Sequence, residues 1–479
     1  MVEENVSRIQ KRIFRATREG NFRTVRNLQK LLAGSRDAGL LAVRRVTQIN
    51  KGKNTAGIDG KTYNKDEEKE QLVAEILDVD FNTYKCKPVA RRYIPKPGKD
   101  EKRPLGIPVM MDRALQMVVK MALEPEWEAK FEQNSYGFRP GRRCMDAIHV
   151  IHGTIAMMKG ATRSAWILDA DIAKCFDMID HEVLLKRIPT FTHIIRGWLK
   201  AGVIEFGQFS KTVRGTPQGG VISPLLANIA LDGMDSLFGA INSKGNYNKP
   251  SKRRGNNKGI IVIRYADDFV IIAPSRDILV NYVIPRLREF LKERGLALSG
   301  AKTRIVHRED GFDFLGFHIR QFVGKYSKIC AVRPSKENLH RLLEGIKGIL
   351  MENKQATQAD VINMLNLKIR GWAYYFRYCH AKQMFVYVDY RIFRMLWWWA
   401  RRRHKNENKS TGWVKDKYFP KVGSRKWTFA DKPDHALFYA ATMRCDMRSY
   451  VKVKGDASPF DPSLNEYWLK RHGKVPQEA

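Results

Sequence analysis

The sequence predicts an α+β fold in which a region of mixed helices and strands precedes a helical domain. Three observations predict it. Apolar residues recur at helical spacing up to Val46, short β-branched runs flank tight turns between residues 94 and 272, and helical spacing returns after Pro334. The chain has 479 residues, 43% of them hydrophobic, which is enough for two to four domains with buried cores.

The charge balance predicts a polyanionic partner. Lys and Arg number 86 against 50 Asp and Glu, a formal net charge of +36. Nucleic acid is the first candidate, and an anionic membrane surface is the weaker one. No window approaches eighteen consecutive apolar residues, and the first residues carry no apolar stretch typical of a secretory signal. The six cysteines are scattered, which argues against a disulfide framework or zinc site. We therefore expect a soluble, intracellular protein.

The amino-terminal residues, 1–75, are expected to form a basic helical extension. Apolar side chains between Ser7 and Val46 follow helical spacing, with Arg and Lys between them, as in amphipathic helices with a basic outer face. For each single charge, a solvated helix surface is the simpler interpretation. The Gly-rich segment Asn50–Gly60 then breaks the helical pattern.

Strands are expected in three places. The segments IPKPGK (94–99) and RPLGIP (103–108) predict a hairpin whose tip carries cations. In WILDADI (166–172), strand alternation gives one apolar face and one face with Asp169 and Asp171. Two β-branched runs around RYADD (264–268) predict a second hairpin with Asp267 and Asp268 at its turn.

The carboxylates on these strands indicate metal chemistry. An adjacent Asp pair alone is weak support, because acidic turn tips are common. Here the pair lies between two apolar strands, and a second acidic strand precedes it in a strongly basic chain. Mg²⁺ prefers oxygen ligands and commonly takes one or two carboxylates plus substrate phosphates. Two such ions would suit an in-line phosphoryl transfer.

The remainder of the chain returns to helix. Leu365, Ile369, Trp372 and Phe376 follow helical spacing. The run Trp397–Trp399 is interpreted as a packed helix end in preference to a base-stacking surface. Boundaries are expected near Lys336 and His404, and the polar, basic segment 242–259 is expected to be an exposed loop.

Several motifs in order resemble those of reverse transcriptases. RYADD (264–268) is similar to their YADD box, DIAKCFD (171–177) to their first acidic motif, GTPQGGVISP (215–224) to their PQG motif, and FLGF (314–317) to the primer-grip segment. The segments GIDG (57–60), SYGFRPGR (135–142) and KIRGWAYYFR (368–377) resemble blocks of group II intron-encoded proteins, the last of them in the maturase (X) domain.

This resemblance implies a site and a right-hand polymerase fold with fingers, an antiparallel palm sheet and a helical thumb. Asp171, Asp267 and Asp268 would be catalytic and would ligate two Mg²⁺ ions, with Asp169 ranked below Asp171. Residues implied to bind the dNTP are Lys96, Arg103, Phe176, Gln218 and Lys302. Phe176 would exclude a ribose 2′-hydroxyl, although an ordinary core aromatic fits equally well. Lys302 would approach the triphosphate or donate a proton, although a solvated lysine is nearly as plausible.

The implied organisation has four parts. They are a basic extension (1–75) that binds RNA, reverse transcriptase fingers and palm (76–335), a thumb or maturase domain (336–404) and a DNA-binding region (405–479). Long family members continue into an HNH endonuclease with paired cysteines. The segment 452–462 resembles the approach to that nuclease, but no Cys-x-x-Cys or His-Asn-His cluster is present, so no second-strand cleavage is expected from this polypeptide.

The function implied by the resemblance is an RNA-directed DNA polymerase and maturase. It would bind its group II intron RNA as a ribonucleoprotein, assist splicing, and copy the intron into cDNA at target DNA from dNTPs during retrohoming, in the bacterial cytoplasm and at the nucleoid. One alternative is a non-catalytic RNA-folding cofactor with a vestigial polymerase site. Another is a domesticated reverse transcriptase in phage defence or DNA repair. A peripheral membrane protein is the poorest fit, because the basic residues are spread over the chain.

Overall fold

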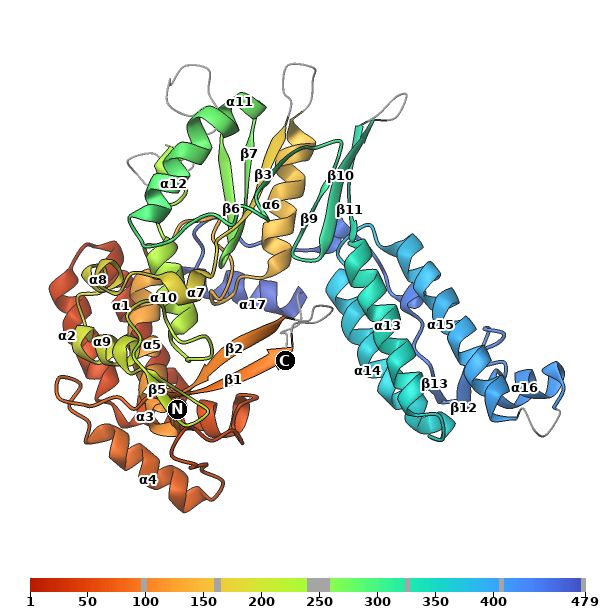
Figure 1. Cartoon of the computed structure of the whole chain (residues 1–479), viewed down its shortest axis with the longest axis horizontal. Coiled ribbons are helices and arrows are strands. Elements are labelled where there is room, and N and C mark those ends of the chain that lie inside the picture. Colours follow the sequence, from red (N-terminus) through yellow and green to blue (C-terminus); the bar gives the residue numbers. More distant parts are fainter. Residues whose placement is uncertain (96–100, 159–164, 239–258, 324–327, 405–408, 475–479) are drawn as a thin grey trace. The chain divides into compact units, whose positions relative to one another are not determined.

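The computed structural model describes residues 1–95, 101–158, 165–238, 259–323, 328–404 and 409–474. The chain forms two compact units (Figure 1). The first unit contains Met1–Ile151, Gly160–His307 and Lys452–Ala479, and the second contains His152–Lys159 and Arg308–Val451. The second unit is therefore inserted into the sequence of the first. The four functional ranges expected from the sequence stay a prediction.

Amphipathic helices begin the first unit, as predicted. Their bounds are α1 (Val2–Arg18), α2 (Phe22–Ala33), α3 (Arg36–Arg44), the π-helix η1 (Arg45–Ile49) and α4 (Asp66–Leu77). Side chains of Asn21 and Ser35 cap α2 and α3 by accepting hydrogen bonds from the backbone N–H three residues on. The apolar stripe packs against α5 (Met110–Glu128), although Leu31, predicted within it, is exposed.

The first four-stranded sheet has the order β2-β1-β4-β5. Its strands are β1 (Val89–Pro95), β2 (Lys102–Ile107), β4 (Val203–Glu205) and β5 (Gln208–Ser210). Strands β1 and β2 pair antiparallel from Ala90–Ile107 to Pro95–Lys102, which confirms the first predicted hairpin. Its tip, with Lys96, lies outside the described residues.

The second four-stranded sheet has the order β6-β7-β3-β8 and is antiparallel throughout. Its strands are β3 (Trp166–Asp171), β6 (Ile261–Tyr265), β7 (Asp268–Ala273) and β8 (Arg304–His307). Leu168 and Ala170 of β3 face the main hydrophobic core, together with Phe269 and Ile271 of β7. Strand alternation therefore leaves the carboxylates of β3 on the opposite face, as predicted.

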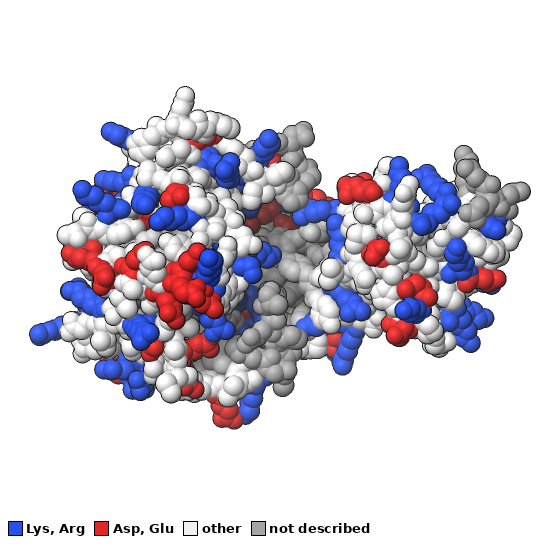
Figure 2. All heavy atoms as spheres, turned by 90° about the horizontal axis from the view of Figure 1, so that it is seen from below, with Lys and Arg blue, Asp and Glu red and all other residues white. Residues whose placement is uncertain are grey.

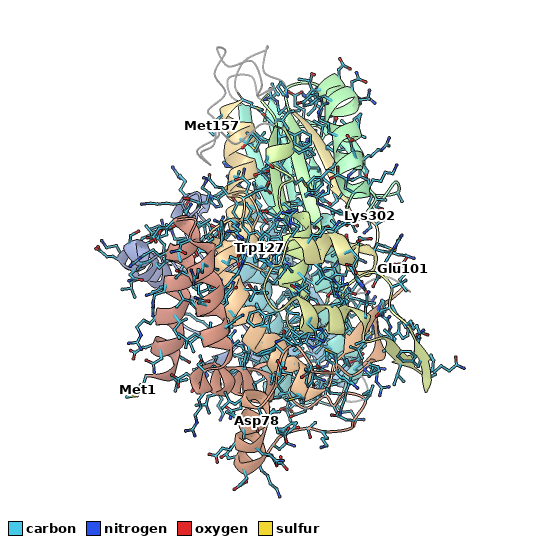
Figure 3. All side chains as sticks on the ribbon, turned by 90° about the vertical axis from the view of Figure 1, so that its left-hand side faces the viewer. Met1, Asp78, Glu101, Trp127, Met157 and Lys302 are labelled. Atoms are coloured by element: carbon cyan, nitrogen blue, oxygen red, sulfur yellow. The ribbon has the colours of Figure 1, made fainter. Side chains whose placement is uncertain are left out.

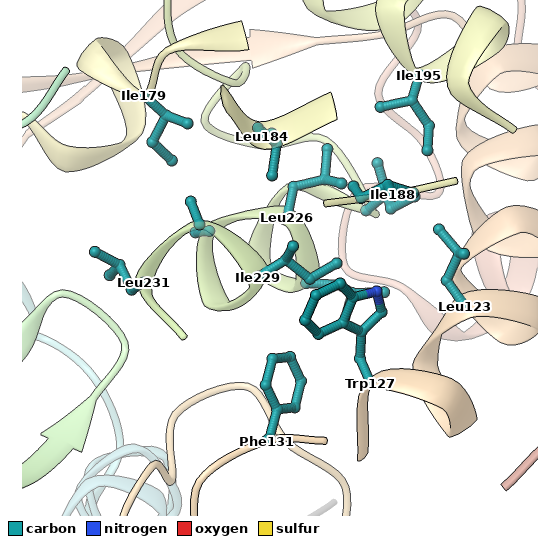
Figure 4. Packing of buried hydrophobic residues seen from close by; sticks show 14 of the residues in the cluster. Leu123, Trp127, Phe131, Ile179, Leu184, Ile188, Ile195, Leu226, Ile229 and Leu231 are labelled. Carbon is teal, nitrogen blue, oxygen red and sulfur yellow. The ribbon is translucent and has the colours of Figure 1, made fainter. Parts of the chain in front are cut away.

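Further helices enclose this core. They are α6 (Cys144–Met157), α7 (Cys175–Met178), α8 (His181–Lys186), α9 (Thr192–Lys200), α10 (Ser223–Leu231), η2 (Ser236–Phe238), α11 (Arg276–Ile278), η3 (Leu279–Val283), α12 (Ile284–Lys292), η7 (Pro462–Leu464) and α17 (Asn465–Lys474). Figure 4 shows Trp127 of α5 packed close to Ile229 of α10 and to Ile188, which follows α8. The core thus joins the amino-terminal helices to the helices beneath the second sheet.

The second unit combines a small sheet with long helices (Figure 1). The sheet has the order β11-β10-β9, from β9 (Phe312–Phe314), β10 (Phe317–Val323) and β11 (Lys328–Pro334). The helices and shorter elements are α13 (Lys336–Glu352), α14 (Gln358–Phe376), α15 (Lys382–Arg403), α16 (Thr411–Tyr418), β12 (Ala430–Lys432), β13 (His435–Ala436), η5 (Ala440–Thr442) and η6 (Met447–Ser449).

The predicted helical stripe of the second unit is buried within α14 at Leu365, Ile369 and Phe376. In α15, Trp397 and Trp399 pack against other aromatic rings, as predicted, whereas Trp398 is exposed. The α+β class is therefore confirmed. Among the described residues, none of the helices has the length and apolarity needed to pass through a bilayer.

Candidate active site

Three carboxylates meet at one end of the second sheet. Asp171 is the last residue of β3 and pairs directly with Asp268, the first residue of β7. Asp268 also pairs with Tyr265 across the β6–β7 hairpin, so that Ala266 and Asp267 form its two-residue turn. The structure therefore brings together the three Asp residues selected from the sequence, although 97 residues separate Asp171 from Asp268.

The turn of this hairpin has an unusual backbone. Ala266 has a φ of 58°, a left-handed conformation that costs energy for a residue with a Cβ atom. Gly137 packs directly on it: a Cβ at that position would lie 2.4 Å from the backbone nitrogen of Ala266. Asn134 and Tyr136 exchange backbone hydrogen bonds with Arg264 of β6, both at 2.9 Å. The segment before Gly137 thus lines the edge of the acidic hairpin.

Arg264 is buried behind the turn. Its guanidinium donates to the Oδ1 of Asn228 at 3.0 Å and to the carbonyl of Ala266 at 3.2 Å. Burial lowers the pKa of the guanidinium. The negative charges of Glu132 and Asp232 partly offset this shift. Burial likewise raises the pKa of Glu132 to about 7. A cation therefore fixes the turn from inside the protein.

Two cations approach the carboxylates of β3 from the solvent side. The Lys302 ammonium donates to Oδ2 of Asp171, and the Arg304 guanidinium donates to Oδ2 of Asp169 at 2.8 Å. The turn that carries Lys302 is anchored to β3, since the Ser299 N–H donates to the Asp171 carbonyl at 2.8 Å. Lys302, labelled in Figure 3, keeps most of its side chain exposed. Asp169 is thus already paired with a protein cation.

The carboxylates repel one another. The pKa of Asp268 is raised to about 7, mainly because folding removes part of the water around its carboxylate. The remainder of its surface stays in solvent. The negative charges of Asp267 and Asp171 raise the pKa further. Burial also raises the pKa of Asp267, while the positive charges of Lys302 and Arg103 oppose that shift. A cluster of this kind favours the binding of a cation.

The loop containing Gln218 is held beside the first acidic motif. The Thr216 N–H donates to the carbonyl of Phe176 at 2.6 Å, and Gly215 has a φ of 82° with no room for a side chain against this backbone. Phe176 is half-buried in α7, against the core. The carbonyl of Gln218 accepts from the Gly106 N–H of β2 at 2.7 Å. The loop that carries Gln218 is therefore tied both to the first acidic motif and to β2.

Arg103 lies on β2, three residues before Gly106, and its side chain is exposed. Its charge acts on Asp267, so the structure brings it toward the carboxylates. Lys96 lies outside the described residues. Of the five residues expected to bind a dNTP, Lys302 contacts Asp171 directly and the charge of Arg103 acts on Asp267. Phe176 and Gln218 are linked to neighbouring segments through their backbone carbonyls.

The donor set suits a hard divalent cation. All three side chains offer oxygen, and their mutual repulsion leaves negative charge that a cation would neutralise. Within the described part of the chain, no three acidic, His or Cys side chains converge closely enough to enclose an ion by themselves. That is compatible with Mg²⁺, which commonly completes its shell with substrate phosphates and water.

Sequence reasoning missed three residues that shape the site. Arg304 neutralises Asp169, and Gly137 supports the turn. Arg264, known from the sequence only as the first residue of the RYADD motif, is a buried cation that holds the turn. The strand alternation of β8 could have located Arg304, because Asp169 pairs with it across the sheet. Nothing in the local pattern marks Arg264 as buried.

The fold and the carboxylate cluster define a class of enzyme. A family model described as "Reverse transcriptase (RNA-dependent DNA polymerase)" matches residues 94–319, which contain the whole cluster. The chain therefore carries a reverse transcriptase domain. Two further models match, the "N-terminal domain of reverse transcriptase" over residues 1–76 and the "Group II intron, maturase-specific domain" over residues 339–419. The chain belongs to the group II intron reverse transcriptase and maturase family.

Curated relatives agree with this assignment. "Protein YkfC" of Escherichia coli (strain K12) is 34% identical over 320 residues, covering 61% of this chain and 83% of its own length. "Group II intron-encoded protein LtrA" of Lactococcus lactis subsp. cremoris is 30% identical over 406 residues, covering 68% of this chain and 66% of its own. The "Uncharacterized 91 kDa protein in cob intron" of Schizosaccharomyces pombe is 24% identical over 440 residues, covering 77% of this chain. The chain spans 53% of that relative's length.

Proposed function

We propose that Asp171, Asp267 and Asp268 hold two Mg²⁺ ions and catalyse the addition of dNTPs to a primer on an RNA template. The observation that carries this proposal is the direct pairing of Asp171 with Asp268 across β3 and β7, with Asp267 in the adjoining turn. Bound there, Mg²⁺ would supply the positive charge that stabilises the attacking and leaving oxygens of an in-line phosphoryl displacement.

The residues of the chain have distinct tasks in this reaction. Asp171 and Asp268 orient the reacting ends from two adjacent strands, whose hydrogen bonds fix their separation. Lys302 is positioned to leave Asp171 when substrate arrives, because its side chain is largely exposed. It then neutralises the triphosphate or donates a proton to the leaving pyrophosphate.

Nucleotide recognition is proposed for the residues around the cluster. Arg103 would contact the triphosphate as a charge-assisted donor, together with Lys96. Phe176 would lie under the sugar and exclude a 2′-hydroxyl, supported by the fixed backbone of the turn that carries it. Gln218, on a loop tied to both that turn and β2, would approach the nascent base pair.

The proposed architecture is a right-hand polymerase. Residues 76–335 would form fingers and palm, with the second four-stranded sheet as the palm, and residues 336–404 would form the thumb. The amino-terminal extension of residues 1–75 and a DNA-binding region of residues 405–479 would complete it. The matches of the reverse transcriptase and maturase family models support this division.

Intron RNA is the proposed partner of the maturase domain. On α15, Arg guanidinium groups lie 5.6 to 6.0 Å from the ring centres of exposed Tyr387, Tyr390 and Trp398, one helical turn away. Such pairs offer both a cation for phosphate and a ring for an unpaired base. Figure 2 shows Lys and Arg distributed widely over the face it presents, with acidic residues among them. A phosphate backbone could therefore be gripped at many points.

We infer a role in intron mobility from these parts. The protein and its intron RNA would form a ribonucleoprotein that assists splicing, inserts the intron into target DNA and copies it into cDNA, in the bacterial cytoplasm and at the nucleoid. The maturase-domain match and the intron-encoded relative from Lactococcus support this role.

Primer extension on an RNA template with dNTPs and Mg²⁺ tests the polymerase. The native chain should extend the primer, and Asp268→Asn, which preserves the side-chain shape, should lower kcat by several orders of magnitude. Glu289→Gln on the exposed face of α12 is the matched control and should behave as the native chain does. Equal extension by native and Asp268→Asn proteins would show that the carboxylate cluster is not the polymerase site.

The non-catalytic alternative makes a different prediction. If the chain served only as an RNA-folding cofactor, it would assist splicing but give no extension with any primer and template. The three carboxylates are all present, and their mutual repulsion lowers the stability of the fold. A protein that bound no cation there would have no use for this loss of stability.

A further inference from the structure

The carboxyl-terminal segment 452–471 belongs to the first unit, although it follows the second unit in sequence. Its anchor is a buried ion pair: Arg471 donates to both carboxylate oxygens of Asp146, each at 3.0 Å. Their side chains are 2% and 0% exposed. Asp146 also accepts from the Val453 N–H at 2.8 Å. Residues more than 300 positions apart in sequence therefore share one buried polar cluster.

The same segment covers the loop that supports the hairpin. Trp468 packs on Gly141, where a Cβ atom would lie 2.6 Å from the ring, and the Arg471 guanidinium donates to the Gly141 carbonyl at 2.6 Å. Arg142 donates to the carbonyl of Gly455 at 2.9 Å and to that of Gln133 at 2.6 Å. Both ends of the loop 133–142 are thus held by the carboxyl-terminal segment or by residues bound to it.

The loop in turn determines where the catalytic hairpin lies. It hydrogen-bonds along β6 through its residues before Gly137, and Gly137 meets the Ala266 backbone without a gap. Arg139 fixes the middle of the loop by a buried two-point ion pair with Glu128. It also donates to the backbone carbonyls of Ser135, within the loop, and of Glu132, which precedes it. If the loop moves, the turn that carries Asp267 must therefore move with it, because the two are joined by backbone contacts and not by flexible side chains.

We propose that Arg471, Asp146 and Trp468 are positioning residues of the polymerase site, which rests on the function proposed above. The segment 452–471 acts as a brace: it fixes loop 133–142, and the loop fixes the Ala266–Asp267 turn. The sequence predicts that this segment belongs to a DNA-binding region. In the proposed role it contributes to polymerisation on any primer and template, including those without the intron's DNA target.

Arg471→Met removes the ion pair and leaves the Asp146 carboxylate buried without its cation. It should lower kcat for primer extension by about 10- to 100-fold, the size of effect expected when reacting groups shift by about 1 Å. The Mg²⁺ concentration for half-maximal rate should rise, while the Kd for primer and template stays unchanged. Arg471→Lys restores the charge but lacks the second nitrogen that holds the Gly141 carbonyl, so it should recover part of the rate.

The control is Glu289→Gln on the exposed face of α12, outside the proposed DNA-binding region, and it should extend primers as the native chain does. Asp268→Asn serves as the inactive reference. If the native chain is inactive, or Asp268→Asn is active, the proposed function fails. If both behave as expected and folded Arg471→Met has native kcat and Mg²⁺ dependence, only the brace is refuted.

Two further outcomes are decisive. A variant whose only defect is a lower Tm has lost a merely structural contact, and that result overturns the proposal, as does a loss confined to target-DNA binding. Where Arg471→Met does not fold, Trp468→Phe decides instead, because it keeps most of the apolar packing but loses the hydrogen bond from Nε1 to the Ser458 carbonyl. Slower extension at an unchanged Tm supports the brace, and native extension refutes it.

Discussion

Gly137→Ala adds one methyl group where the supporting loop meets the catalytic hairpin. The new Cβ would lie 2.4 Å from the Ala266 nitrogen and 3.0 Å from its Cβ, whereas ordinary contacts begin at 3.4 Å. The turn must therefore move by about 1 Å. The methyl group would meet backbone atoms of Ala266, which cannot rotate away as a side chain can. Gly137 does not have a left-handed φ, so backbone strain at Gly137 itself would not contribute to the effect.

The expected result is a large loss of rate with a smaller loss of stability. Moving Asp267 and Asp268 by about 1 Å should lower kcat by on the order of 100-fold, and overpacking of this kind costs about 1–3 kcal/mol. Steady-state primer extension gives kcat and the KM for dNTP, and thermal unfolding gives Tm. Gly153→Ala on α6, where nothing lies within 4 Å of the added Cβ, is the control; it should leave kcat unchanged and raise Tm slightly, because Ala favours a helix interior over Gly. Native kcat in a folded Gly137→Ala protein would refute the reasoning.

Four further outcomes are expected. Folding raises the pKa of Asp268 from 3.8 to about 7, so between these pH values the folded chain binds more protons than the unfolded chain and loses stability as pH rises. Calorimetry without Mg²⁺ should therefore show a higher Tm for Asp268→Asn than for the native chain at pH 8, and little difference in Tm at pH 4. Arg103→Ala should raise the KM for dNTP roughly 10- to 150-fold, since a charge-assisted hydrogen bond contributes roughly 1.5–3 kcal/mol. An unchanged KM would remove Arg103 from the binding site. Arg391→Ala should weaken intron RNA binding and reduce the salt slope by about 1, whereas Lys347→Ala, a residue already paired with an acidic neighbour, should do so less; equal slopes in a filter-binding titration would argue against a specific grip by α15. A double variant, Asp267→Ala with Asp268→Ala, should still promote splicing in a self-splicing assay, and loss of splicing despite normal RNA binding would show that the two activities share residues.

The strand faces and the turn that carry the carboxylates were predictable from local rules, whereas their assignment to one site came from the resemblance to reverse transcriptases. Alternation along β3 separates Asp169 and Asp171 from the apolar face, and the two β-branched runs around Asp267 require a tight turn between them. The class of fold followed from the same periodicities. The two carboxylate signals lie within residues 166–172 and 260–272, so a single sequence contains them in full.

What could not be predicted depends on contacts between distant segments. The pairing of Lys302 with Asp171 requires the register of β3 against the following turn, and the support of Ala266 by Gly137 requires a loop placed against the hairpin edge. The ion pair of Asp146 with Arg471 joins residues 325 positions apart, each of which looks like an ordinary surface charge in the sequence. Burial gives these residues their roles, and burial is a property of the whole fold.

The insertion of the second unit within the first has a consequence for synthesis of the chain. Ribosomes add about 5–20 residues per second, so Asp146 is made roughly 16 to 65 s before its partner Arg471, given their separation of 325 residues. During that interval the inserted unit can fold, while the Asp146 carboxylate remains hydrated and the loop beside it unbraced. The polymerase would mature last, after translation has passed the intervening domain, so a nascent chain could bind RNA before it is able to copy it.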